Sequence, residues 1–169
     1  VVFVAYQPLH VSVFANDVLL LDDGRIRLQV TSVDGQCVHC EVVQGGLLTS
    51  RKGINRLGGG LSADAITEKD MADLQFIIEQ RLDYVAVSFP STPSDLQPVK
   101  DALRAASNDA KIIAKIERAE AVASDEGLIA LIDASDGVMV ARGDLGVEIG
   151  DPQLIAMQKK IIHFSRKAN

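Results

Sequence analysis

Aromatic side chains and positive charge are both scarce in this chain of 169 residues. Tryptophan is absent, aromatic residues make up 4% of the chain, and the formal net charge is −6. Nucleic acids and anionic membranes attract basic surfaces, and proteins that bind unstacked bases rely on aromatic side chains. We therefore expect neither a nucleic acid nor a membrane as a partner.

The chain also lacks a long apolar run and a basic leader. The apolar start V-V-F-V-A-Y-Q-P-L-H is interrupted by Pro8 and His10. A membrane-spanning helix needs about 20 predominantly apolar residues in succession, and a secretory signal begins with positive charge. The absence of both patterns favours a cytoplasmic protein.

Cysteine is limited to Cys37 and Cys40, in the segment C-V-H-C. A C-x-x-C pair around His39 could indicate metal or redox chemistry. The segment alternates like a strand, however, which places the two thiols on opposite faces, and no second ligand pair completes a tetrahedral site. We expect two reduced thiols in a small sheet.

The hydrophobic pattern changes near residue 48. Residues 1–48 contain short apolar runs separated by turn signals such as Asp22-Asp23-Gly24 and Asp34-Gly35. Asp-Gly between alternating runs is a strong hairpin signal, so this part is predicted to be a small all-β module. Its expected strands are V-F-V-A-Y, D-V-L-L-L, R-I-R-L-Q-V and C-V-H-C-E-V-V.

Residues 49–169 instead alternate between helical and strand patterns, which predicts an α/β fold with a parallel sheet. The expected strands cover residues 83–89, 111–117 and 137–141, and the last of these is apolar enough to be buried on both faces. The expected helices cover residues 67–80 with Thr67 as N-cap, a segment with Ser94 and Gln97 as capping box, a stretch within 119–134, and a segment opening at Asp151-Pro152.

Polar residues gather where two of these strands end. Lys115 and Glu117 are two residues apart and point the same way, and Asp144 follows the next strand. Ligands of α/β sheets bind at the carboxyl ends of strands. Two carboxylates suit Mg²⁺, and a lysine beside them suits a phosphoryl group or an oxyanion. On spacing alone, a structural ion pair between Lys115 and Glu117, or capping and loop carboxylates, remain open alternatives.

The segment K-I-I-A-K-I-E-R-A-E-A-V, followed by D-G-V-M-V-A-R-G-D-L-G-V-E-I, resembles the core signature of the pyruvate kinase family. The resemblance extends upstream through L-L-L-D-D-G-R-I, S-R-K-G-I-N-R-L, T-E-K-D-M-A-D-L and D-Y-V-A-V-S-F, and so covers nearly the whole chain. It implies that residues 1–48 are part of a small inserted β domain and that residues 49–169 are part of a catalytic barrel.

The implied fold is a partial (β/α)₈ TIM-type barrel of about three parallel β/α units, because a closed barrel needs about 250 residues. The chain is then expected to be a piece of a longer enzyme, without the first three and last two barrel strands. The resemblance also implies a homotetramer, and K⁺ whose ligands lie outside this chain.

The resemblance further implies transfer of a phosphoryl group from phosphoenolpyruvate to ADP, giving pyruvate and ATP. Lys115 would contact the transferred group and stabilise the enolate, while Glu117 and Asp144 would hold Mg²⁺ or Mn²⁺. The amides of Gly143 and Asp144, at a helix start, would accept the substrate carboxylate. Lys52 would face the nucleotide phosphates, although a solvated lysine in a linker is the simpler interpretation of S-R-K-G-I-N.

Two alternatives compete with this function. One is a metal-dependent lyase or aldolase on a pyruvate-binding barrel, which would not need Lys52 in an inserted β module. The other is a non-catalytic piece that associates with itself through open strand edges. Because residues that position both substrates would lie outside the chain, we expect no appreciable turnover from these 169 residues alone.

Overall fold

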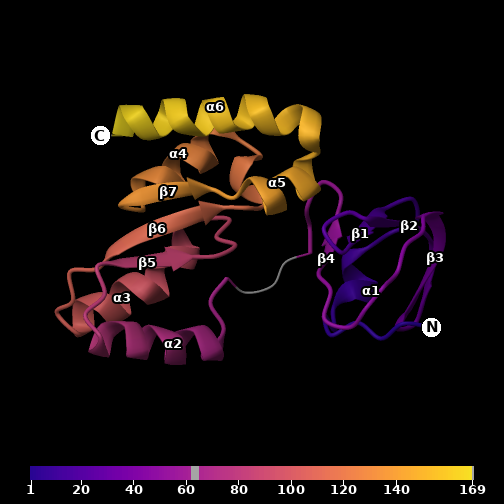
Figure 1. Ribbon diagram of the computed structural model, residues 1–169, viewed down its shortest axis with the longest axis horizontal. Helices are drawn as coiled ribbons and strands as arrows, with labels where there is room; N and C mark the ends of the chain where they lie inside the picture. Colours follow the sequence, from indigo (N-terminus) through magenta and orange to yellow (C-terminus); the bar gives the residue numbers. More distant parts are fainter. Residues whose placement is uncertain (62–64, 169) are drawn as a thin grey trace. The chain divides into compact units, whose positions relative to one another are not determined.

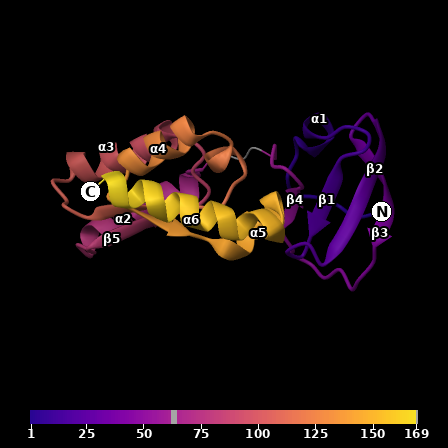
Figure 2. The same ribbon diagram turned by 90° about the horizontal axis from the view of Figure 1, so that it is seen from above.

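The computed structural model describes residues 1–61 and 65–168, in two compact units (Figure 1, Figure 2). One unit comprises Val1–Ser62 with Val147–Gly150, and the other comprises Ala63–Gly146 with Asp151–Asn169. The first contains α1 (Leu9–Ser12), β1 (Val18–Leu21), β2 (Ile26–Asp34), β3 (Cys37–Gln44) and β4 (Ile54–Arg56). The second contains α2 (Glu68–Glu79), β5 (Tyr84–Val87), α3 (Gln97–Ala105), β6 (Lys111–Ile116), α4 (Asp125–Asp133), β7 (Gly137–Val140) and α6 (Asp151–Ala168). Helix α5 (Arg142–Ile149) starts in the second unit.

The first unit is a four-stranded antiparallel sheet in the order β3-β2-β1-β4. The hairpin turns follow the sequence signals, because Asp22, Asp23 and Gly24 all have positive φ between β1 and β2, and Gly35 has positive φ between β2 and β3. Left-handed backbone at Asp and Gly is the conformation that tight hairpins require. The predicted hairpins are therefore present.

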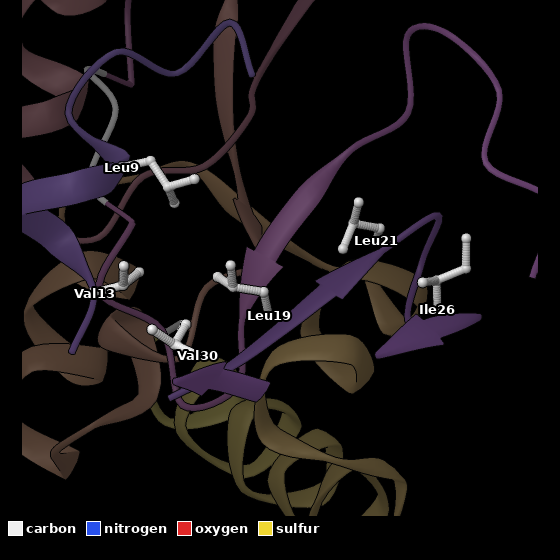
Figure 3. Close-up of a cluster of buried hydrophobic side chains, with 6 residues drawn as sticks. All are labelled: Leu9, Val13, Leu19, Leu21, Ile26 and Val30. Atoms are coloured by element: carbon white, nitrogen blue, oxygen red, sulfur yellow. The ribbon is translucent and has the colours of Figure 1, made fainter. Parts of the chain in front are cut away.

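Six buried side chains form the core of this unit, and Figure 3 shows them gathered between the helical turn α1 and the sheet. They are Leu9, Val13, Leu19, Leu21, Ile26 and Val30. Val38 and Cys40 pack against the same cluster, whereas Cys37 is exposed. The two thiols thus lie on opposite faces of β3 and are both free, as predicted. Burial raises the pKa of the Cys40 thiol.

Two predictions for this unit are corrected. The V-F-V-A-Y segment forms no strand, and the chain instead enters α1 immediately after Pro8, so the unit is not all-β. The unit also continues past residue 48, because β4 pairs with β1 through Leu20 and Asn55. A three-residue strand is too short to be seen in the sequence, yet it moves the division between the units to residue 62.

The second unit contains a three-stranded parallel sheet in the order β5-β6-β7. Its register pairs Val85 with Ile112 and Ala114 with Val138. Figure 1 shows α2 and α3 on the β5 side of this sheet and α4 and α6 on the β7 side. Three parallel strands joined through helices confirm the predicted α/β pattern of this part.

Local capping explains where the helices begin. Thr67 caps α2, and its capping box with Asp70 confirms the predicted start. The predicted box of Ser94 and Gln97 is wrong, because Thr92 and Asp95 form the box and a 3₁₀ turn, Pro93–Leu96, precedes α3. The helix expected within 119–134 is divided into a second 3₁₀ turn, Glu120–Val122, and α4, which Ser124 caps. Among the residues described, no helix is both long and apolar enough to cross a membrane.

The two faces of the parallel sheet differ in burial. One face is buried beneath the helices, and its side chains are Val85, Val87, Ile112, Ala114 and Ile116. The opposite face is open within this unit, since Tyr84 is 65% exposed and Met139 is 45% exposed. The prediction that β7 is buried on both faces is therefore wrong for this structure. Lys115 lies on the open face, in register with Met139.

Candidate active site

The central strand β6 carries the ammonium and the carboxylate that the sequence brings together. Lys115 lies near its carboxyl end, and Glu117 follows Ile116, the last strand residue. Strand alternation turns both side chains to the same side. Lys115 Nζ lies 2.6 Å from Glu117 Oε1, which confirms that the two groups meet.

The end of the neighbouring strand β5 supplies a partner for each group. Lys115 Nζ donates a hydrogen bond to Ser88 Oγ at 2.8 Å. The backbone N–H of Phe89 donates to Glu117 Oε2 at 2.7 Å. Both partners come directly after β5, so the parallel register of β5 and β6 places them beside the pair.

Burial sets the electrostatics of this pair. The Glu117 side chain is fully buried, whereas the Lys115 side chain is 25% exposed. Glu117 Oε1 lies at ion-pair distance from the ammonium, yet no donor among the described residues gives it a hydrogen bond of acceptable geometry. A buried carboxylate oxygen with unused lone pairs is costly unless a cation satisfies it. The Lys115 ammonium supplies this positive charge at 2.6 Å, and Oε1 keeps a lone pair that a divalent cation beside Lys115 would be able to use.

Asp144 and Gly143 lie beyond the adjacent strand, β7. The pairing of β6 and β7 continues to this point, because Ala141 N donates to Ile116 O at 3.1 Å. Helix α5 then begins at Arg142, so Gly143 and Asp144 lie in its first turn. Asp144 is exposed rather than a cap for a helix starting at Leu145.

The structure thus places Glu117 and Asp144 beyond the carboxyl ends of adjacent strands. Over residues 1–61 and 65–168, no ion pair joins Asp144 to Lys115, and no group of three or more His, Cys, Asp or Glu residues has the arrangement of a metal centre. A metal site built from these two carboxylates stays a prediction.

Lys52 lies in the unit with the antiparallel sheet, between β3 and β4, where it is exposed but forms an ion pair. Its Nζ lies 2.7 Å from Asp22 Oδ1, and Arg25 approaches the other oxygen at 3.6 Å. The hydrogen bond from Lys52 lowers the pKa of the Asp22 carboxyl, and the positive charges of Lys52 and Arg25 act in the same direction. Asp22 is therefore more than a turn residue, because it fixes the position of this lysine.

Comparison with known proteins decides the family. The family model described as "Pyruvate kinase, barrel domain" matches residues 1–169, which is the whole chain. The chain belongs to the pyruvate kinase family. This confirms the resemblance inferred from K-I-I-A-K-I-E and R-G-D-L-G.

Curated pyruvate kinases give the scale of the similarity. The chain is 54% identical over 164 residues to pyruvate kinase of Haemophilus influenzae and to pyruvate kinase II of Salmonella typhimurium. It is 39% identical over 162 residues to pyruvate kinase of Mycobacterium tuberculosis. Each match covers 96–97% of this chain but 34% of the relative, so the chain spans about a third of the length of these pyruvate kinases.

Sequence reasoning on the pyruvate kinase motifs missed three partners of the predicted site residues. The motif D-Y-V-A-V-S-F predicts Ser88 and Phe89 only as the end of a strand, although a polar residue at a strand end is a usable signal. The turn signal Asp22-Asp23-Gly24 predicts Asp22 only as a turn residue, although a carboxylate at the end of an apolar strand, L-L-L-D-D, needs a counter-ion when it is buried. The structure supplies that counter-ion as Lys52.

Proposed function

We propose that this chain contributes part of the phosphoryl-transfer site of a pyruvate kinase, in which phosphoenolpyruvate and ADP give pyruvate and ATP. The observation that carries the proposal is the Lys115–Glu117 pair at the carboxyl end of β6, 2.6 Å apart and with one buried oxygen lacking a hydrogen bond. Phosphoryl transfer needs positioning and charge stabilisation more than covalent help from the protein. A fixed ammonium beside a buried carboxylate meets both needs.

Glu117 and Asp144 would hold Mg²⁺ or Mn²⁺. The fit rests on the donor set, because Glu117 Oε1 is buried without a hydrogen bond and Asp144 offers an exposed carboxylate at the next strand end. Carboxylate oxygens are the ligands that these hard cations take in proteins. A bound divalent cation would supply charge neutralisation for the substrate oxygens.

Lys115 would stabilise the negative charge of the transferred group and of the enolate. Its bond to Ser88 Oγ holds the ammonium at the open face, where a quarter of the side chain stays accessible. Gly143 leaves open space, since a Cβ added there would meet nothing within 4 Å. The backbone of Gly143 and Asp144 would therefore be accessible to a substrate carboxylate at the start of α5.

Lys52 would bind the phosphates of ADP through its ammonium group. The support is that the Lys52 side chain is 36% exposed while its ammonium is anchored by the Asp22 carboxylate, so the side chain is held in place without being fully covered. A lyase or aldolase has no use for such a residue, and membership of the pyruvate kinase family favours the kinase. Removing the ammonium with Lys52→Ala should weaken ADP binding, and unchanged ADP affinity would favour the lyase.

The second unit would form three β/α units of a (β/α)₈ barrel. The parallel register, the helix-covered face and the open face with Lys115 support this, because barrel strands carry helices outside and side chains inside.

An open face and two unpaired strand edges also favour self-association of the isolated chain, with a homo-oligomer as the family expectation. Size-exclusion chromatography at several concentrations should show oligomers, and a monomer at every concentration would contradict the self-association.

A chimaeric enzyme gives the direct test of the function. The matching 164 residues of the Haemophilus influenzae enzyme would be replaced by this chain. We expect the chimaera to form pyruvate from phosphoenolpyruvate and ADP in a coupled assay, and the isolated chain to show no appreciable turnover. Lys115→Met in the chimaera should lower kcat by about 10²–10³-fold, as expected for loss of one electrostatic stabiliser.

Lys160→Met is the matched control, because Lys160 forms an ion pair with Asp125 between α6 and α4, on residues assigned no part in the site. It should leave kcat unchanged. Full activity of the Lys115→Met chimaera would remove the basis of the proposal.

A further inference from the structure

Phe89 has a backbone conformation that needs an explanation. Its φ is +60°, in the left-handed region that bulky L-residues rarely occupy. The next residue, Pro90, is fully buried, and a residue before proline is normally extended. Burial of the ring does not explain the conformation either, since Phe89 is 41% exposed. Strained backbone persists when other interactions hold it in place.

The interaction that holds Phe89 is made by its backbone. Its N–H donates to Glu117 Oε2 at 2.7 Å, and hydrogen bonds to a charged acceptor are shorter and stronger than neutral ones. The Phe89 ring lies under the Arg118 guanidinium, with the carbon of that group 5.6 Å from the ring centroid. The residue that follows Glu117 thus also contacts Phe89, so the two strand ends are joined at two points.

The hydrogen bond from Phe89 gives the two carboxylate oxygens of Glu117 different partners. Oε2 accepts the Phe89 N–H, and Oε1 lies against the Lys115 ammonium without a hydrogen bond. Because the carboxylate is planar, fixing Oε2 also fixes the direction in which Oε1 points.

We propose that Phe89 is a positioning residue: its left-handed backbone holds Oε2 of Glu117 and so presents Oε1 to Lys115 and to a divalent cation. The cation part of this inference rests on the proposed function. Partners that orient a metal ligand typically change metal affinity by about 10–100-fold when they are lost. The positioning role lies in the backbone at position 89 and not in the ring.

A substitution series at position 89 separates the backbone from the ring. Phe89→Gly and Phe89→Asn remove the ring but tolerate positive φ, whereas the β-branched side chain of Phe89→Val makes positive φ unfavourable. Asn and Val are the matched pair, because both lose the contact with Arg118. Amide hydrogen exchange in the full chain, measured by NMR, reports the hydrogen bond at residue 89 without any metal.

We expect slow exchange at residue 89 in the wild type and in Phe89→Asn, and exchange at least about tenfold faster in Phe89→Val. Amides within β5 and β6 serve as the folding control. If Phe89→Val does not fold, Phe89→Thr, which is also β-branched, against Phe89→Asn carries the same comparison. Equal exchange at residue 89 across the series would overturn the inference.

Affinity for Mn²⁺, measured by calorimetry on the same variants, tests the cation part. It should stay within about twofold of the wild type in Phe89→Asn and fall by about tenfold in Phe89→Val. Equal affinity in both variants would overturn the positioning role toward the cation. A wild-type chain that keeps the protected amide but binds no Mn²⁺ would instead refute the proposed metal site, so the two failures are distinguishable.

Discussion

Two lysine–carboxylate pairs in this chain have nearly the same length and very different surroundings. Lys115 and Glu117 approach to 2.6 Å with the carboxylate fully buried, and Lys52 and Asp22 approach to 2.7 Å with the carboxylate 12% exposed. Asp22 has a second cation, Arg25, at 3.6 Å, whereas Glu117 Oε1 has no hydrogen bond among the described residues. Distance alone does not distinguish these pairs, but burial and incomplete hydrogen bonding do.

A third pair extends the comparison to the surface. Lys69 and Asp73, one turn apart on α2, form an ion pair in which the side chains are 80% and 57% exposed. The hydrogen bond with Asp73 raises the pKa of Lys69. From Glu117 through Asp22 to Asp73, the carboxylate becomes steadily more exposed. The stability that each carboxylate contributes should decrease in the same order.

Glu117→Gln should have the largest effect on stability. The amide keeps the shape of the side chain but leaves the Lys115 ammonium without its counter-ion at a largely buried position. Removing one partner of a buried pair costs about 3 kcal/mol. Urea denaturation followed by circular dichroism measures the loss, with Asp22→Asn as the equivalent change in the other pair. An equal loss of unfolding free energy in the two variants would show that burial of the carboxylate does not determine how much each pair contributes to stability.

Replacing both members of the buried pair should be milder than removing one. The double variant Lys115→Met, Glu117→Leu leaves no isolated charge, because apolar side chains of similar volume often substitute for a buried ion pair at little cost. It does remove the acceptor of the Phe89 N–H, which costs about 1–2 kcal/mol. The same urea titration should therefore place it between the wild type and Glu117→Gln. A double variant less stable than Glu117→Gln would contradict this account.

Asp22→Asn should change the acid sensitivity of the chain. Lys52 lowers the pKa of Asp22 from its ordinary value of 3.8, so the contribution of the ionised carboxylate is present above about pH 4. It is lost as the pH falls through the lowered folded pKa. Urea midpoints measured from pH 6 down to pH 2.5 should therefore fall less steeply in Asp22→Asn than in the wild type. The same dependence of the urea midpoint on pH in both proteins would show that the Asp22–Lys52 pair does not contribute to acid sensitivity.

Asp73→Asn should have the smallest effect. Exposed ion pairs one helical turn apart are screened by salt and contribute little. The urea midpoint at 0.15 M salt should be indistinguishable from that of the wild type. A midpoint shift as large as that of Asp22→Asn would break the predicted order of the three pairs.

The local patterns of the sequence predicted the elements that local forces determine. Alternation in K-I-I-A-K-I located β6, Asp-Gly signals located the hairpins, and Thr67 located the start of α2. The same alternation predicted that Lys115 and Glu117 share a side. These features depend on residues close in sequence, so the sequence alone determines them.

The features that the sequence did not predict depend on distant partners. Strand β4 is recognisable only through its pairing with β1, where Leu20 meets Asn55. The left-handed conformation of Phe89 is not a preference of phenylalanine, and its backbone N–H donates a hydrogen bond to a carboxylate 28 residues away. The anchoring of Lys52 by Asp22 similarly joins two turns that no local motif connects.

Lys115 also has a consequence for how β6 finds its neighbours. Along β6, Lys115 lies between Ala114 and Ile116, whose side chains point to the opposite face and are fully buried beneath the helices. Sliding β6 by a single residue would drive the ammonium into that apolar layer and bring an isoleucine to the open side. Burying the Lys115 charge would therefore destabilise a misaligned pairing of β6. The side chain that we propose for phosphoryl transfer thus also favours the correct strand register during folding.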